Sequence, residues 1–106
     1  MAPVLESVVM TEVERVLTRH PEGKQGVRIE KDKYDGMVAA LLAVIPDQEP
    51  GVRFSELEEL VVPHLPADVY SEDVSVAWYL TTIKLDLEAR GAIRRLRGSP
   101  QRLVRV

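Results

Sequence analysis

The residue types best suited to catalysis or metal binding are few in this sequence. His20 and His64 are the only histidines, they lie far apart, and neither belongs to a pattern that places metal ligands on one helix face. There is no cysteine, which excludes thiolate metal sites, disulfide bonds and a cysteine nucleophile. The adjacent carboxylates Glu58 and Glu59 have no polar neighbour suited to acid–base chemistry. We therefore predict a protein that is not an enzyme and needs no metal or other cofactor.

The charged residues are unevenly distributed along the chain. Six arginines and no acid fall within residues 90–106, whereas residues 1–89 carry eight basic and 17 acidic residues. A basic C-terminal end on an acidic body favours an anionic partner. The arginines could equally form a solvated face or pair with the acidic body. Such pairs would join Arg94 and Arg105 to Glu56, Glu58 and Glu59.

Length and hydropathy fit one small globular domain. The chain has 106 residues, of which 45% are hydrophobic, enough to bury a core. No apolar run is long enough to cross a bilayer. The first 20 residues include acids and lack a basic flank, which makes them a poor signal peptide. We therefore expect a cytoplasmic protein.

The first 31 residues are predicted to form a helix and a linker arm. Apolar residues recur at helical spacing from Pro3 to about Arg19, although the many valines also favour a strand. Residues 21–31 contain glycine breaks and are predicted to connect this arm to a compact body at 32–106. Within the connection, "VRI" can form a short extended piece.

The body is predicted to contain three helices, at about 33–45, 56–62 and 71–90. The strand "VRF" precedes the second helix, and the strands "AIRRL" and "QRLVRV" follow the third, joined by "RGSP". Asp32 is predicted to cap the first helix.

The other helix ends also carry recognisable signals. Ser55 and Glu58 fit a capping box at the second helix. Ser71 is followed by two acids that suit the first turn of the third helix, and Gly91 suits its end.

The segments "FSELEEL", "LEARGAI" and "RRLRGSPQRLVRV" give residues 32–106 a resemblance to a winged-helix domain. The sequence pattern "HLP…WYLTTIKLDLEARG…PQRL" also resembles a small uncharacterised bacterial family of this fold. The resemblance implies an α+β fold with a three-helix core, a small antiparallel β-wing and, here, an extra N-terminal helix. It implies no particular activity.

The resemblance also implies where nucleic acid would bind. In bacterial winged-helix regulators, the outward face of the third helix reads DNA and the wing contacts phosphates. By position, the helix contacts would be Ser75, Trp78, Tyr79, Thr81, Thr82 and Lys84. The wing contacts would be Arg95, Arg97, Ser99, Gln101 and Arg102. One hypothesis is therefore a DNA-binding transcriptional regulator that contacts phosphates through its arginine-rich wing.

The third helix is apolar on two faces, which favours a different use of the same fold. At about 100° per residue, one stripe contains Val76, Leu80, Ile83 and Leu87, and a nearly opposite stripe contains Val74, Trp78, Leu85 and Ala89. A DNA-reading face needs Arg, Lys, Asn or Gln. Glu72 and Asp73 near the helix start would also repel phosphate.

Some other element is therefore expected to cover the second stripe. The N-terminal helix or a second copy of the chain would do so. The predicted contact surface consists of Leu5, Val9, Val13, Val16, Val74, Trp78 and Leu85. Our leading prediction is a homodimeric protein-interaction module in regulation, with DNA binding through the wing as the alternative.

Overall fold

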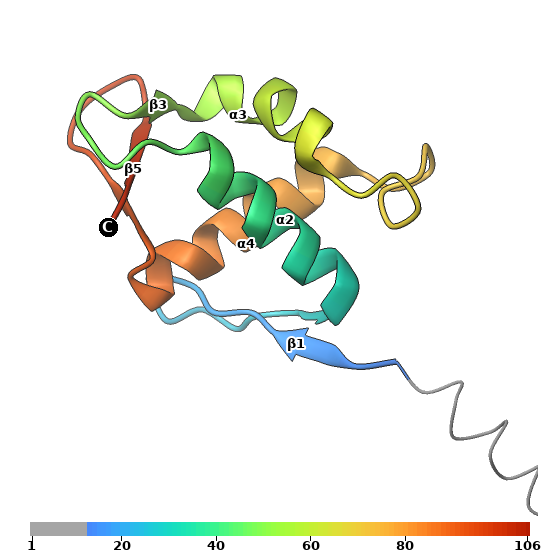
Figure 1. Ribbon diagram of the computed structural model, residues 1–106. Coiled ribbons are helices and arrows are strands. Elements are labelled where there is room, and N and C mark those ends of the chain that lie inside the picture. The colour runs from blue at the N-terminus through green and yellow to red at the C-terminus, as the bar shows by residue number, and fades with distance from the viewer. Residues whose placement is uncertain (1–12) are drawn as a thin grey trace, which may run out of the picture.

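A computed structural model describes residues 13–106, which form three α-helices and two small antiparallel sheets (Figure 1). The predicted α+β class is confirmed at this level. In chain order the elements are β1 (Arg15–Leu17), β2 (Arg28–Glu30), α2 (Lys31–Val44), β3 (Val52–Arg53), α3 (Phe54–Val61), the 3-10 helix η1 (Val62–His64), α4 (Val76–Arg90), β4 (Ile93–Arg95) and β5 (Arg102–Arg105). Leu5 and Val9 of the predicted contact surface lie outside the described residues.

The predicted N-terminal helix is wrong for its last residues, because β1 is a strand that pairs with β2. Val16 lies opposite Ile29 in this antiparallel hairpin, which we call the N-terminal hairpin. Alternating burial explains the strand: Ile29 and Thr18 are buried against the helices, whereas Leu17 is 54% exposed. β-branched valine suits such a pleated, half-buried surface. The predicted extended piece "VRI" is confirmed in β2.

The core lies where α2, α3 and α4 pack against one another and against the three-stranded sheet (Figure 1). The predicted stripes of α2 and α4 supply most of it. The large buried side chains are Met37, Leu41 and Ile45 from the α2 segment, Leu57 and Val61 from α3, Leu80, Ile83 and Leu87 from α4, and Ile93 and Leu103 from the sheet.

The C-terminal strands form the predicted hairpin, β4–β5, and β3 joins its other edge to give the order β3-β5-β4. The register pairs Val52 with Leu103, and Arg94 with Val104. Gly51 makes this approach possible. It has φ of +71°, and a Cβ there would lie 2.2 Å from the carbonyl oxygen of Leu103, so no larger residue fits.

The helix starts differ from those predicted. α3 begins at Phe54, and the Glu56 carboxylate, not that of Glu58, accepts a hydrogen bond from the backbone N–H of Arg53 at 3.4 Å. The predicted capping box of Ser55 with Glu58 is therefore wrong. α2 begins at Lys31, so Asp32 lies in its first turn and is not its cap.

α4 also starts later than predicted, at Val76. The Ser75 hydroxyl caps it by accepting the backbone N–H of Trp78 at 3.2 Å. Glu72 and Asp73 thus precede the helix and do not lie in its first turn. The predicted end is confirmed, since Gly91 has φ of +80° at the C-cap.

Candidate functional site

Asp86 of α4 holds the N-terminal hairpin against the helices. Its side chain is completely buried, and its carboxylate accepts the backbone N–H of Arg19 at 2.8 Å. The same carboxylate accepts the Tyr34 hydroxyl of α2, and the Nε of Arg90 lies 2.9 Å from both of its oxygens. A buried carboxylate is stable only when donors satisfy it in this way. All three donors come from different elements, so Asp86 joins the hairpin, α2 and α4.

The pKa values of the Asp86 partners reflect this arrangement. Burial, followed by the hydrogen bond to Asp86, raises the pKa of Tyr34 to about 12. The hydrogen bond to Asp86 also raises the pKa of Arg90. Both groups therefore keep their protons at neutral pH, and neither is prepared to act as a general base.

Lys84 is the second buried charged residue of α4, at 2% exposure. Its Nζ lies 2.7 Å from Glu88 and donates to the side chain of Gln101 at 2.7 Å. It also lies 4.9 Å from the centroid of the Phe54 ring. Burial lowers the pKa of Lys84, while Glu88 opposes that shift. Lys84 is therefore an internal anchor for the C-terminal hairpin, and the prediction that it contacts nucleic acid is wrong.

The second apolar stripe of α4 is only partly covered. Trp78, Thr82 and Leu85 line a hollow together with Thr18, Arg19, His20, Gln25, Gly26 and Val27 of the N-terminal hairpin. Trp78 remains 48% exposed, with its ring edge-on to Tyr79 at 4.9 Å. Among residues 13–106, the cover on this stripe comes from the N-terminal hairpin and leaves Trp78 exposed. Coverage by a second copy of the chain stays a prediction.

The other predicted contact residues lie at several depths. Val16 on the inner side of β1, Val74 before α4, and Leu85 are half-buried. Val13 is 48% exposed. On the outward side of α4, Ala77 and Thr81 are exposed and Thr82 is half-buried.

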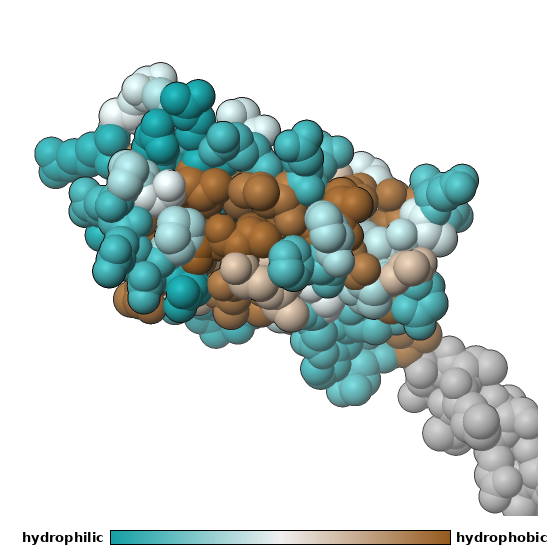
Figure 2. Space-filling model, turned by 45° about the horizontal axis from the view of Figure 1, so that its top comes forward, coloured by the Kyte–Doolittle hydropathy of each residue, from teal (hydrophilic) through white to brown (hydrophobic). Residues whose placement is uncertain are grey.

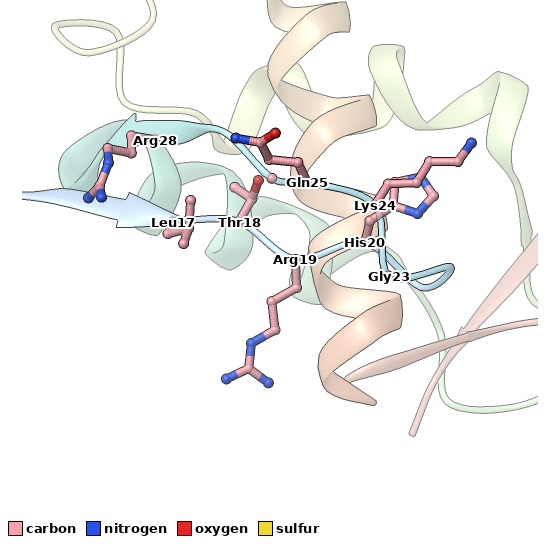
Figure 3. Close-up of a pocket in the computed structure, with 9 residues that line it drawn as sticks. Leu17, Thr18, Arg19, His20, Gly23, Lys24, Gln25 and Arg28 are labelled. Carbon is pink, nitrogen blue, oxygen red and sulfur yellow. The ribbon is translucent and has the colours of Figure 1, made fainter.

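A larger hollow within the N-terminal hairpin does not have the form of a catalytic site. Its polar lining includes Arg19, His20, Lys24 and Arg28. In Figure 3 these side chains do not converge: Arg19 points away from the hairpin, Arg28 lies near one end, and His20 and Lys24 lie together near the turn. Within residues 13–106, no cluster of His, Cys, Asp and Glu could hold a metal ion. Over the same residues, none of the helices combines the length and apolar character that a bilayer-spanning segment requires.

Three arginines of the C-terminal hairpin share one hollow, which we call the arginine hollow. It is lined by Glu49, Pro50, Arg94, Leu96, Arg97 and Arg102. Arg94 lies 3.8 Å from Glu49, and both side chains are more than half exposed. Arg105 instead donates to the backbone carbonyl of Ile45 at 2.9 Å. The proposed pairing of Arg94 and Arg105 with the acids of α3 is therefore wrong.

The remaining predicted wing residues divide into two groups. Arg95 lies 3.3 Å from Glu88, and Gln101 is bonded to Lys84, so both are directed toward α4. Ser99 lies exposed in the turn. Only Arg97 and Arg102 of the predicted set face the arginine hollow.

An apolar area covers the side of the molecule that carries α2 and α3, as Figure 2 shows. Val38 and Leu42 of α2 are only partly buried against the core. Leu60 of α3 is 40% exposed, and Val62 of η1 is 52% exposed. This side of the molecule therefore exposes apolar side chains from three neighbouring elements.

Most of the chain corresponds to one known family. Residues 15–103 match the family of unknown function DUF6958. The chain belongs to this family. The match begins in β1 and ends in β5, so the family region includes both hairpins. It also runs across the domain boundary that was predicted after residue 31. No curated protein and no solved structure matches the chain.

The residue of this DUF6958 chain that sequence reasoning missed is Asp86. A signal was present: a lone acid between two leucines in "KLDLEAR", with an arginine four positions later. An acid in an apolar helical segment is expected to be paired when buried. The partners Arg19 and Tyr34 lie 67 and 52 positions away, respectively, which is why the pattern alone did not reveal them.

Proposed function

We propose that this DUF6958 chain is a winged-helix protein. The order α2, β3, α3, α4, β4, β5 supports this assignment, as does the antiparallel sheet order β3-β5-β4. In this arrangement α4 occupies the place of the recognition helix, and the C-terminal hairpin occupies the place of the wing. The N-terminal hairpin is an addition to that plan and packs on α2 and α4.

We further propose that the module acts in regulation by binding protein and does not read DNA bases. The observation that carries this proposal is the chemistry of α4. Its only two basic residues, Lys84 and Arg90, are both paired with carboxylates of the same helix, Glu88 and Asp86. What α4 presents outward along its first half is Ala77, Trp78 and Thr81.

This surface is poorly suited to base reading. Bidentate recognition of guanine or adenine requires Arg, Lys, Asn or Gln at the groove, and the one exposed residue of these types in α4, Arg90, is the last residue of the helix and is paired with Asp86. The N-terminal hairpin also lies against its C-terminal half, through Arg19 and Asp86. An exposed Trp beside apolar side chains is the composition enriched at protein–protein contacts.

Fluorescence anisotropy with labelled random and mixed-sequence duplexes tests the proposal, at low and at physiological salt. We expect no sequence preference and no binding that persists at physiological salt. Salt-resistant binding that is lost in Trp78→Ala or Thr81→Ala would overturn the proposal. Val106→Ala, which shortens an exposed side chain outside α4, serves as the matched control.

The second candidate function is phosphate contact through the wing. Arg97 and Arg102 face the same hollow as Arg94, and Glu49 is the only acid that lines it. Under this alternative, binding at low salt would fall steeply with salt and disappear in Arg97→Ala/Arg102→Ala. Arg15→Ala/Arg28→Ala removes two arginines from the N-terminal hairpin and controls for net charge.

A further inference from the structure

α3 carries an acidic and apolar surface that has no partner among residues 13–106. Its sequence, FSELEELV, holds three glutamates and no basic residue. Leu60 is 40% exposed, with Glu56 one turn before it and Glu59 beside it, both exposed. Among residues 13–106, no glutamate of α3 lies within salt-bridge distance of a basic group.

The arginine hollow has the opposite chemistry. The hairpin register places Arg94 opposite Val104, and Leu96 donates its N–H to the carbonyl of Arg102 at 2.9 Å. Arg94, Leu96 and Arg102 therefore share one face of the hairpin, with the leucine between the arginines. Like charges at such positions repel, and a single exposed glutamate, Glu49, offsets them. The hollow thus combines an apolar centre with an excess of positive charge.

The two surfaces adjoin each other but cannot meet within one chain. β3 pairs with β5 and leads directly into α3, and Phe54 at the helix start bonds to the carbonyl of Gln101 (Figure 1). Leu60 lies six residues further along α3, or about 9 Å along the helix axis. The helix leads away from the sheet, so Leu60 cannot reach the arginine hollow of its own chain.

We propose that a second copy of this chain supplies the partner of the α3 surface: Leu60 of each copy enters the arginine hollow of the other, and Glu56 and Glu59 meet its arginines. Because complementary surfaces lie next to each other on one chain, a two-fold axis satisfies both contacts at once. The proposal rests on the protein-interaction role argued above and names its partner. Arginines around an apolar centre are typical of the side chains that dominate binding energy.

Sedimentation velocity of the full chain over a range of concentrations tests this pairing. We expect a dimer that weakens as salt is raised, since its contacts include exposed charges. Glu56→Lys/Glu59→Lys places positive charge opposite the arginine hollow. Arg94→Glu/Arg97→Glu places negative charge opposite α3. Each variant alone should dissociate at least about a hundredfold more readily, because like charges across an interface cost several kcal/mol.

Mixing the two variants provides the decisive measurement. The lysines of one copy then face the glutamates of the other, and the unchanged surfaces still match, so the dimer mass should return in the equimolar mixture. Asp68→Lys/Glu72→Lys makes the same charge change outside α3 and should leave the dimer intact. Circular dichroism of each variant tests whether it is folded. Return of the dimer mass on mixing also requires that both variants are folded.

The pairing is overturned if the wild-type chain is a monomer, if either swap variant dimerises like wild type, or if the mixture stays monomeric. Any of these results leaves the protein-interaction proposal standing, because that proposal fails only if salt-resistant duplex binding depends on Trp78 or Thr81. The two proposals can therefore fail separately.

Discussion

The two hairpins of this chain are both fixed to α4 by a buried charged residue, but the chemistry differs. Asp86 is an acceptor that takes a backbone N–H, a phenol and a guanidinium. Lys84 is a donor that depends on two side chains, Glu88 and Gln101. Asp86 thus binds the main chain of the N-terminal hairpin, whereas Lys84 binds a side chain just before β5, Gln101, which substitution can remove.

The two hairpins also differ in how accessible they are. At the N-terminal hairpin, Thr18 and Ile29 are buried and the polar contacts are satisfied internally. At the C-terminal hairpin, Arg97 is exposed and Arg94 has only a long contact with Glu49. The first hairpin is anchored in the fold by buried residues, whereas the second exposes positive charge at the surface.

Removing Asp86 should produce the largest effect. Asp86→Ala leaves the Tyr34 hydroxyl, the Arg19 N–H and the Arg90 guanidinium without their acceptor. Breaking a buried, hydrogen-bonded charge in this way costs about 3–5 kcal/mol of unfolding free energy. Urea denaturation measures that loss. Asp86→Asn keeps one acceptor oxygen and should therefore lose less unfolding free energy. Equal losses of unfolding free energy in the two variants would contradict the role of the carboxylate.

Tyr34→Phe tests one donor of the same cluster. Losing a hydrogen bond to a charged group costs about 1.5–3 kcal/mol, measured by urea denaturation at neutral pH. Tyr70→Phe, which removes a hydroxyl bonded to the backbone of Lys33, is the matched comparison without a charged acceptor.

The same residue gives a pH dependence of known sign. The pKa of Tyr34 is raised to about 12 from 10.0 in the unfolded chain. Above pH 10 the unfolded state therefore loses its proton first, and the stability due to Tyr34 decreases as pH rises toward 12. Burial raises the pKa of Tyr70 as well, which acts in the same direction. Tyr34→Phe should make the decrease shallower, and an unchanged slope would contradict the assignment.

Local patterns allowed part of this fold to be predicted. The spacing of Met37, Leu41 and Ile45 predicted the buried face of α2, and Gly91 predicted the end of α4. The C-terminal strands followed from their alternation and turn residues. Each of these signals lies within a few residues of the structure it determines.

The candidate sites were less predictable, because they depend on distant contacts. The first strand of the N-terminal hairpin was expected to be helical, since Val16 also fits a helical stripe and its strand partner, Ile29, lies outside that segment. Lys84 was expected to face outward, and only its contacts with Glu88 and Gln101 explain its burial. In both cases, the strand conformation of β1 and the burial of Lys84, tertiary contacts outweigh local sequence preference.

Gly26→Ala should open the N-terminal hairpin with an intermediate effect. A Cβ at Gly26 would lie 1.8 Å from the carbonyl oxygen of Thr18, so the two strands must separate. Forced overpacking of this kind costs about 1–3 kcal/mol. Hydrogen exchange should accelerate at the backbone amides of Thr18 and Val27, which bond across the hairpin.

The control for Gly26 is Gly23, in the same loop. Gly23 has φ of +76° with nothing near its would-be Cβ, and asparagine tolerates that conformation. Gly23→Asn should therefore leave those two amides protected. Equal acceleration in the two variants would show that the hairpin is sensitive to any change in its loop, and not to the close approach at Thr18.

Arg95→Ala should have the smallest effect on stability. Arg95 pairs with Glu88 at 3.3 Å, but its side chain is 46% exposed, and pairs open to solvent contribute about 0.2–1 kcal/mol. Glu88 also keeps Lys84 as a partner at 2.7 Å, so its buried carboxylate is not left unpaired. Urea denaturation at low and high salt should show a small loss that shrinks with salt. A loss as large as that of Asp86→Ala would mean that the C-terminal hairpin is held as firmly as the N-terminal one, and the contrast between the two hairpins would fail.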